Sequence, residues 1–383
     1  MVVIDMNQFL SIGFKPLFLC TALSAVILIG VWGGYFNGVL NGFSPVVSPV
    51  LWHGHEMLFG FVGSAIGGFL LTAVASWTRR PAVSGSLLGW IVFCWFAGRL
   101  VMAFDVGLPL LFRIAADSAY WFMLTIVIGR EVVFSKNTRN YPVVAILSGF
   151  LGLSIAFHFY PAESLRGCLA LICVLITLIA GRIVPAFTAN WLKLTLGPMV
   201  STPVSFNRFD RVVVVLTLPT LFGWSLYPFD FRLGWLLCLV SILHAIRLTR
   251  WSGHKTLVEP LVFALHASYG WLPVGFALLG LTAIGCDVPL SAGQHALGIG
   301  AIAAMIIAVA SRATMGHSGQ ALKSGRLLTT SLMLIHLVAI LRISAILIPD
   351  FLSLSIAVWL LTFSIFAYFL IQVIFFPARL RDH

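Results

Sequence analysis

Long apolar runs, separated by short polar or glycine-rich stretches, make up most of this chain of 383 residues. A helix rises about 1.5 Å per residue, so a run of about 20 apolar residues crosses the roughly 30 Å hydrocarbon layer of a bilayer. A helix also satisfies its own backbone polar groups, as lipid requires. The pattern predicts about twelve transmembrane helices, at residues 17–36, 52–77, 84–104, 108–130, 142–160, 166–188, 211–228, 232–250, 260–282, 292–312, 327–348 and 351–376.

The stretches between these runs are too short to fold as separate soluble domains. We therefore predict an all-α, polytopic membrane helix bundle that forms one integral membrane domain over residues 1–383. The composition agrees, because 60% of the residues are hydrophobic and only 9% are charged, a balance typical of a chain whose solvent is lipid. The lipid bilayer is accordingly the first expected partner.

The formal net charge of +11 would suit nucleic-acid binding, but the basic residues are unevenly divided between the two sides of the predicted spans. If the N-terminus is cytoplasmic, eighteen of the 23 Lys and Arg residues, including Arg379 and Arg381, lie on the cytoplasmic side. The opposite side receives only Arg113, Arg166 and Arg232. This asymmetry predicts that both termini are cytoplasmic, and nucleic acid is not expected as a partner.

Histidine is costly inside a membrane span unless it faces a partner, a cavity or a cofactor. His53 and His55 open the second span, His295 opens the tenth and His158 closes the fifth, so all four lie toward one membrane face. On a regular helix the side chains at 53 and 55 point about 160° apart, so one metal does not easily take both. We predict that one of them ligates a haem or copper, while the other faces a second ligand set, a hydrogen-bond partner or water.

A second group of histidines lies toward the opposite face. His244 falls late in the eighth span, His266 falls early in the ninth at a similar depth, and His317 falls in the loop expected after the tenth. These three residues are a candidate metal site. The six cysteines show no CxxC spacing, so a zinc or disulfide framework is not indicated.

Charged side chains within the spans also need partners. Arg113 and Asp117 are spaced i,i+4 and are expected to pair with each other. Arg99 and Arg342 lie at the depth where the propionates of a haem held by the histidines of that face would emerge, and Arg binds carboxylates with two parallel hydrogen bonds. We interpret both as cofactor-binding residues, with snorkelling to lipid headgroups as the alternative.

Small residues and a proline mark two further features. Gly60, Ser64 and Gly68 recur every four residues along the second span, which favours close packing of a neighbouring helix, with a planar macrocycle as the alternative. Glycines also follow His295 one and two turns further on, so the tenth span echoes the second. Pro185 predicts a kink or break at 182–190, at the end of the sixth span.

Several kinds of chemistry are excluded. The sequence holds no nucleophile elbow, phosphate loop or HExxH helix, and no pair of carboxylates in mid-span that would suggest a conventional proton relay. Hydrolase and ATPase functions are therefore not expected. Gas or electron chemistry at a metal cofactor fits a membrane interior that is rich in histidine and poor in acid.

Five strings of the sequence resemble the NnrS family. They are IGFKPLF at 12–18, WHGHEMLFGF at 52–61, GRIVPAFTAN at 181–190, LHASYGWLP at 265–273, and the run at 295–319. The resemblance extends over nearly the whole chain. It implies a twelve-span protein of the bacterial inner (cytoplasmic) membrane that contains haem and copper and is associated with denitrification and with protection from nitric oxide.

A weaker likeness is to the catalytic subunit of haem-copper oxidases, through residues 53–69 and 295–301. On that likeness His53 and His295 would be the two axial ligands of one b-type haem. The adjacent histidine pair and the His-Pro-Glu string of the oxidase copper site are absent, so a standard oxygen-reducing centre is not expected.

We predict a metalloprotein that binds or reacts with nitric oxide at iron or copper and thereby protects against nitrosative stress. Two other classes stay open from the sequence. One is a transporter of a small ligand or metal, which broken helices and small-residue stripes would also serve. The other is a sensor or assembly factor that binds haem or metal without turnover. Whether the chain is an NO-handling oxidoreductase, and which electron donor it would use, also stays open.

Overall fold

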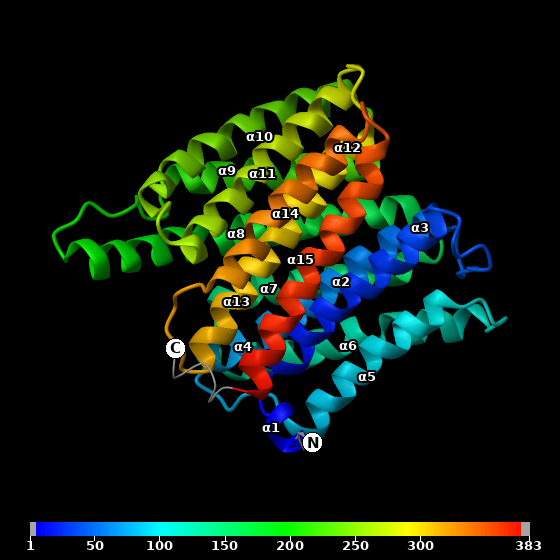
Figure 1. Cartoon of the computed structure of the whole chain (residues 1–383), viewed down its shortest axis with the longest axis horizontal. Coiled ribbons are helices and arrows are strands. Elements are labelled where there is room, and N and C mark those ends of the chain that lie inside the picture. The colour runs from blue at the N-terminus through cyan, green and yellow to red at the C-terminus, as the bar shows by residue number, and fades with distance from the viewer. Residues whose placement is uncertain (1–4, 377–383) are drawn as a thin grey trace. The chain divides into compact units, whose positions relative to one another are not determined.

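The computed structural model describes residues 5–376, which form helices joined by turns and loops, with no β-strand among them (Figure 1). The predicted all-α class is confirmed. The cytoplasmic location of both termini stays a prediction, and Arg379 and Arg381, on which it partly relies, lie outside the described residues.

Within residues 5–376, twelve helical segments are long and apolar enough to cross a membrane, as the sequence predicted. They are Phe14–Phe36, Pro49–Thr78, Gly85–Ala103, Leu110–Phe134, Thr138–Phe157, Pro161–Leu196, Arg208–Leu226, Phe231–Thr249, Pro260–Ala283, Leu290–His317, Arg326–Ser344 and Asp350–Phe375. The chain is therefore a multi-pass membrane protein.

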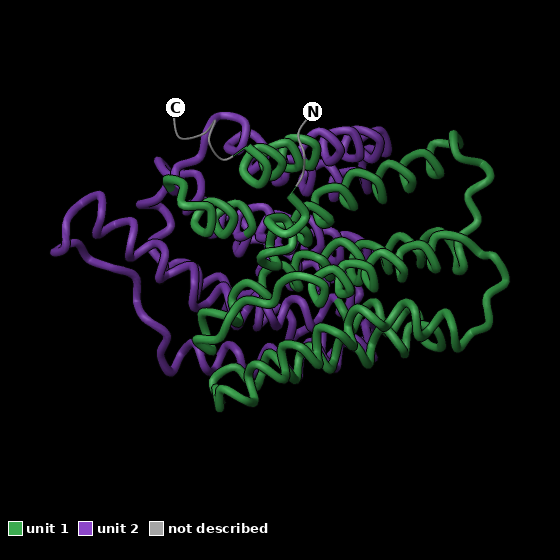
Figure 2. The backbone as a smooth tube through the Cα atoms, turned by 90° about the horizontal axis from the view of Figure 1, so that it is seen from below, with its two compact units in different colours: residues 1–168, 310–321, 363–383 green, residues 169–309, 322–362 purple. Residues whose placement is uncertain are grey.

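The chain divides into two compact units, which are described separately (Figure 2). Within the described residues, unit 1 comprises 5–168, 310–321 and 363–376, and unit 2 comprises 169–309 and 322–362. The prediction of one membrane domain over 1–383 stays a prediction.

Unit 1 contains the first five spans. Its elements are α1 (Met6–Phe9), α2 (Phe14–Phe36), α3 (Pro49–His55), the π-helix η1 (Glu56–Phe61), α4 (Val62–Thr78), α5 (Gly85–Ala103), α6 (Leu110–Phe134), the 3-10 helix η2 (Thr138–Asn140) and α7 (Tyr141–Phe157). The segments α3, η1 and α4 follow one another without a break and together form the second span.

Three helices run from one unit into the other: α8 (Pro161–Leu196), α13 (Ala304–His317) and α15 (Asp350–Phe375). The remaining elements of unit 2 are α9 (Arg208–Leu226), α10 (Phe231–Thr249), the 3-10 helix η3 (Gly253–Thr256), α11 (Pro260–Ala283), α12 (Leu290–His295), the π-helix η4 (Ala296–Ala303) and α14 (Arg326–Ser344). The tenth span consists of α12, η4 and α13 in succession.

Polar side chains fix the starts of several helices. Asn207 and Asp210 form a capping box at the start of α9: the Asn207 side chain accepts from the backbone N–H of Phe209, and the Asp210 side chain accepts from that of Asn207, each at 3.0 Å. Asp230 accepts from the backbone N–H of Arg232 at 2.9 Å and so caps α10. Such caps satisfy backbone groups that the first turn of a helix leaves without a partner.

The small-residue stripe of the second span packs against a neighbouring helix, as the sequence favoured. The hydroxyls of Ser64 on α4 and Thr21 on α2 lie 2.9 Å apart. A Cβ added at Gly68 would lie 2.7 Å from the ring of Phe18, also on α2. Close approach of this kind is what small residues provide in a membrane, where packing rather than the hydrophobic effect joins helices.

Two predicted helix ends are wrong. The α8 helix is not broken at 182–190 but continues through Pro185 to Leu196. Proline removes one hydrogen bond without forcing an end, and the Thr188 hydroxyl donates to the Val184 carbonyl at 2.9 Å in the same turn. His317, expected in a loop, is the last residue of α13.

Candidate functional site

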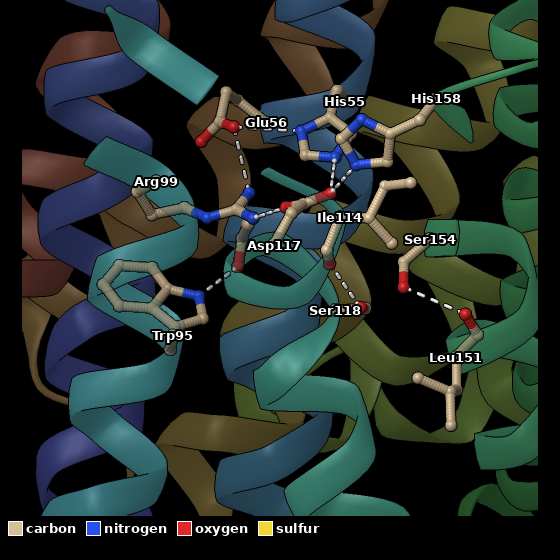
Figure 3. A network of polar contacts seen from close by, with 11 residues as sticks. His55, Glu56, Trp95, Arg99, Ile114, Asp117, Ser118, Leu151, Ser154 and His158 are labelled. Carbon is tan, nitrogen blue, oxygen red and sulfur yellow. Dashed lines mark hydrogen bonds and ion pairs between the residues drawn. The ribbon is translucent and has the colours of Figure 1, made fainter. Parts of the chain in front are cut away.

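Five ionisable side chains meet in unit 1 near the junction of α3 and η1 (Figure 3). His55 Nδ1 lies 3.0 Å from Glu56 Oε1, and His55 Nε2 lies 3.0 Å from Asp117 Oδ2 on α6. Arg99 on α5 donates to both carboxylates, at 3.0 Å to Glu56 Oε1 and 2.9 Å to Asp117 Oδ1. His158, which caps α7, places Nε2 3.3 Å from Asp117 Oδ2. We call these five residues the carboxylate–histidine cluster.

The cluster is almost completely shielded. The side chain of Arg99 is the most exposed of the five, at 10%, and that of Asp117 is at 0%. Charges out of contact with water interact strongly, and each is costly unless it is paired and hydrogen-bonded. The mutual arrangement of two carboxylates, a guanidinium and an imidazole meets that requirement.

The partners of Asp117 and Arg99 differ from those that the sequence suggested. Asp117 pairs with Arg99, not with Arg113 as the i,i+4 spacing suggested, because its carboxylate points from α6 toward α5 and His55. Arg99 was predicted to face a haem propionate. Its terminal nitrogens are bound by the protein's own carboxylates, from Glu56 and Asp117.

His53 and His55 have separate surroundings, as their predicted 160° separation requires. The His53 ring stacks on Trp32 of α2, with ring centroids 4.7 Å apart and an angle of 19° between the planes. His55 instead packs against Phe157, at 4.4 Å between centroids, and has a carboxylate on each ring nitrogen. His55 thus faces a hydrogen-bond partner on each side of its ring.

A π-helix follows directly after both histidine-bearing turns. His55 precedes η1, and His295 precedes η4. π-Helical turns are rare in proteins, and those that occur are often found at functional sites. Such a turn widens the helix and leaves backbone carbonyls that can accept from other donors. In η1 the carbonyl of Gly60 accepts from the indole N–H of Trp95 at 2.9 Å.

One ring nitrogen of His295 is hydrogen-bonded to the backbone, and the other has no hydrogen bond among the described residues. Nδ1 lies 2.7 Å from the carbonyl oxygen of Ser291, one turn earlier on α12. A carbonyl only accepts, so Nδ1 carries the hydrogen and the lone pair of the neutral imidazole is on Nε2. No hydrogen bond of Nε2 occurs within residues 5–376. A histidine that ligates a metal has this arrangement.

Arg342 lies on α14, which contacts the helix α12 that ends at His295, and both residues belong to unit 2. Among the described residues its guanidinium has no acidic partner and no hydrogen bond. A cation inside a span without a protein carboxylate is suited to bind an anionic group of a ligand. His295 and Arg342 together therefore fit an iron ligand and a propionate partner of a haem. His53, the other axial candidate, lies in unit 1.

The three histidines of the predicted second site are found in separate surroundings. His244 places Nδ1 2.7 Å from the Tyr269 hydroxyl and Nε2 3.0 Å from the Thr217 hydroxyl. His266 places Nε2 2.8 Å from the Thr188 hydroxyl. These two lie in unit 2.

His317 lies in unit 1, where its ring stacks on Phe14 with centroids 5.8 Å apart. Within residues 5–376 no three His, Cys, Asp or Glu side chains are arranged to hold a metal ion. The described donors thus do not form a copper ligand set, and no step is derived through copper.

The sequence missed a buried ion pair beside His244. Arg247 is fully buried and donates from Nε to Asp210 Oδ1 at 2.8 Å, and from one terminal nitrogen to the Thr177 carbonyl at 2.9 Å and the Tyr269 hydroxyl at 3.0 Å. Charge counting places Arg247 at the cytoplasmic end of its predicted span and does not reveal a buried partner. The missed signal was Asp210, an acidic residue immediately before the predicted span 211–228.

The sequence also missed how Glu56 and Asp117 come together. It indicated no carboxylate pair for a proton relay, yet the structure joins these two through His55. Glu56 lies near the start of its predicted span, whereas Asp117 lies well inside the predicted span 108–130, so the two were not recognised as a pair at one depth. The signal that was present is that Glu56, Asp117 and His158 all fall toward the same predicted membrane face.

Comparison with known proteins gives one result that matters for identity. No curated protein matches the chain. The family model described as NnrS protein matches residues 8–377, which is nearly the whole chain. Because the match is so extensive, the chain belongs to the NnrS family, and this membership gives it a role in the nitric oxide response.

Proposed function

We propose that this chain is a protein of the bacterial inner membrane that binds b-type haem and copper, takes nitric oxide as its ligand or substrate, and protects the cell against nitrosative stress. Family membership supports the general role. The observation that carries the finer proposal is in unit 2. There Nε2 of His295 makes no hydrogen bond among the described residues, and Arg342, on a helix that contacts the helix of His295, has no carboxylate partner among them.

The residues of this region have distinct parts in the proposal. The Ser291 carbonyl holds the ring of His295 and fixes its tautomer, so that Nε2 is the ligand atom. Arg342 binds a propionate and orients the macrocycle. When bound, a haem supplies an iron coordination position for nitric oxide. His53, stacked on Trp32, would be a haem-binding residue of unit 1.

Copper enters the proposal through imidazole donors, which suit that metal. The sequence-based assignment of His244, His266 and His317 as these donors stays a prediction. No mechanistic step is assigned to copper, because the described residues do not assemble these three side chains into one ligand set.

The test is an absorption spectrum and metal analysis of the purified full-length protein, repeated on His53→Ala and His295→Ala. Each substitution should lower the haem content or change the ligation state that the spectrum reports. His254→Ala is the matched control, because His254 is an exposed histidine outside the spans, in the 3-10 helix η3. Unchanged haem spectra in both variants would contradict the ligand assignment.

Proteoliposomes separate turnover from binding. If the protein is an oxidoreductase, it should consume nitric oxide when supplied with an artificial electron donor, and His295→Ala should abolish the consumption. A haem-bound protein that shifts its spectrum with nitric oxide but consumes none is a sensor or a sequestering protein.

A further inference from the structure

A hydrogen bond fixes the tautomer of His336, a histidine in the middle of the eleventh span. His336 lies on α14, and its Nδ1 accepts a hydrogen bond of 3.0 Å from the indole N–H of Trp271 on α11. An indole N–H only donates, so the nitrogen that accepts from it has the lone pair and no hydrogen. The ring of His336 is therefore neutral, with its hydrogen on Nε2.

The Nε2–H of His336 is a donor without an acceptor. The nitrogen is buried, and none of the described residues accepts a hydrogen bond from it. A buried polar group inside a span is costly when nothing compensates it, and such groups commonly mark functional sites. In this tautomer neither ring nitrogen can ligate a metal, because the lone pair is used by Trp271 and the other nitrogen carries the hydrogen. The side chain is suited to a ligand that accepts a hydrogen bond.

Trp271 is fixed in turn by close packing on the tenth span. A Cβ added at Gly300 of η4 would overlap the indole ring of Trp271, so glycine is needed for the ring to lie this close to the π-helix. Gly300 follows His295 by five residues on the same span. Trp271 thus connects the π-helix that follows His295 with His336, and all of these residues belong to unit 2.

His336 and Arg342 border the same buried face of α14. They are six residues apart, which is about 9 Å along the helix. Ala339 is fully buried and lies three residues from each, so the two side chains are about 60° to either side of it around the helix. The same helix contacts α11, α12 and η4. The cation and the neutral donor are therefore placed at two depths of one group of helices.

The chemistry of the donor indicates which ligand it takes. A carboxylate in the middle of a span would need a countercharge, and His336 is neutral. An uncharged acceptor fits it better, while Arg342 suits an anionic group. Nitric oxide is small, uncharged and able to accept a hydrogen bond.

We propose that His336 donates a hydrogen bond from Nε2 to nitric oxide bound in unit 2, and that Trp271 is the positioning residue that keeps the hydrogen on that nitrogen. This inference rests on the proposed function, in which nitric oxide is the ligand and haem supplies its coordination position. The hydrogen bond weakens the N–O bond of the ligand and slows its release.

The experiment is infrared spectroscopy of the full-length protein in lipid nanodiscs, with its haem reduced and exposed to ¹⁴NO or ¹⁵NO so that the N–O stretch is located by difference. His336→Leu should raise the stretching frequency and make nitric oxide dissociate about fivefold faster, the effect of losing one hydrogen bond. His336→Gln keeps an N–H donor and should recover part of both changes. His254→Leu, at an exposed histidine outside the spans, is the matched control and should change neither. An unchanged frequency and rate in His336→Leu would overturn the proposal.

The tautomer is tested without haem, by ¹⁵N NMR of the histidine-labelled apoprotein. The signal of His336, assigned from its loss in His336→Gln, should show the hydrogen on Nε2 alone. Trp271→Phe keeps an aromatic ring but removes the indole N–H, so the tautomer with the hydrogen on Nδ1 should become populated. A wild-type ring with the hydrogen on Nδ1 would overturn the proposal even if His336→Leu does not fold.

The two measurements separate this inference from the proposed function. A wild-type protein that binds no haem would refute both, whatever the tautomer of His336. A wild-type protein that binds haem and nitric oxide, with an N–O stretch that His336→Leu leaves in place, would refute the role of His336 alone.

Discussion

The second and tenth spans are built alike at the turn that carries a histidine, yet the two histidines differ in what they bind. In each, a short α-helix ends at the histidine, His55 or His295, and a π-helix follows at once. Five residues later, each has a glycine, Gly60 or Gly300, that packs against a large side chain of a neighbouring helix. His55 has a carboxylate at each ring nitrogen. His295 has a backbone carbonyl at Nδ1 and no hydrogen-bond partner at Nε2 among the described residues.

The arginines near these histidines differ in the same way. Arg99 is held by two protein carboxylates, and Arg342 has none among the described residues. A repeated backbone arrangement thus serves two chemistries: one site is closed by its own ion pairs, and the other is left open for a ligand. Local sequence alone, which looks similar in the two spans, does not distinguish them, because the acidic partners of His55 and Arg99 include Asp117 from a distant helix.

Removing the closing carboxylate should have the largest effect. Asp117→Ala leaves Arg99 and His55 without one of their two carboxylate partners, and breaking a buried pair in this way costs about 3–5 kcal/mol. Denaturant unfolding of the protein in detergent measures the change in the free energy of unfolding. The control is Glu163→Gln, which removes a solvent-exposed partner of Arg166 and should cost at most about 1 kcal/mol. A loss below that for Asp117→Ala would mean that the cluster is not a buried ion network.

The open site should be the one that loses haem. Removing an outer partner of a metal ligand typically weakens binding about 10–100-fold, so removing the ligand in His295→Ala should weaken it by more than that. His55→Gln should retain haem per folded protein, because both nitrogens of His55 are already occupied. Haem content relative to protein, measured after purification, distinguishes the two. Equal loss in both variants would show that the two histidines do not differ in availability.

Arg342→Gln should reduce haem affinity by about tenfold, the effect of losing one hydrogen bond to a charged group, worth about 1.5 kcal/mol. Arg342→Lys should recover part of this loss, because the charge remains while the two-pronged geometry is lost. Haem titration of the purified apoprotein gives both values. An affinity unchanged in Arg342→Gln would indicate that the side chain snorkels to headgroups instead.

Gly60→Ala should destabilise the protein by about 1–3 kcal/mol, because the added Cβ would lie 2.7 Å from a terminal nitrogen of Arg99 in a close-packed site. The matched substitution in the tenth span is Gly298→Ala, where nothing lies within 4 Å of the added atom. It should change stability by less than about 0.5 kcal/mol. Thermal unfolding of both variants in one detergent makes the comparison. Similar values for the two would show that the glycine in η1 is not needed for Arg99 to approach.

The sequence predicted the spans well and the partners of charged residues poorly, for a physical reason. A span is a property of about 20 neighbouring residues, so hydropathy alone located all twelve. The choice of Asp117 between Arg113, four residues away, and Arg99, on another helix, depends on which way α6 is rotated, and this is a tertiary property. Similarly, α8 continues without a break through Pro185, where a local rule predicted a kink or break.

The candidate site was predictable in composition but not in arrangement. The depth of His53, His55 and His295 followed from their positions at the starts of spans. Which of them has a free nitrogen did not follow, since it depends on the Ser291 carbonyl and on Asp117.

The π-helical turn in the second span also changes which face of the helix the residues after it occupy, relative to the residues before it. Residues before Glu56 and residues after Phe61 do not continue on the same faces as they would on an unbroken α-helix. If one residue were deleted within 56–61 and regular α-geometry returned, Ser64 and Gly68 would turn by about 100° and leave their partners on α2. The extra residue of the π-helix thus lets the charged turn at His55 and Glu56 and the small-residue stripe at Ser64 and Gly68 each face its own neighbouring helix. Single-residue deletions within 56–61 should therefore not be tolerated.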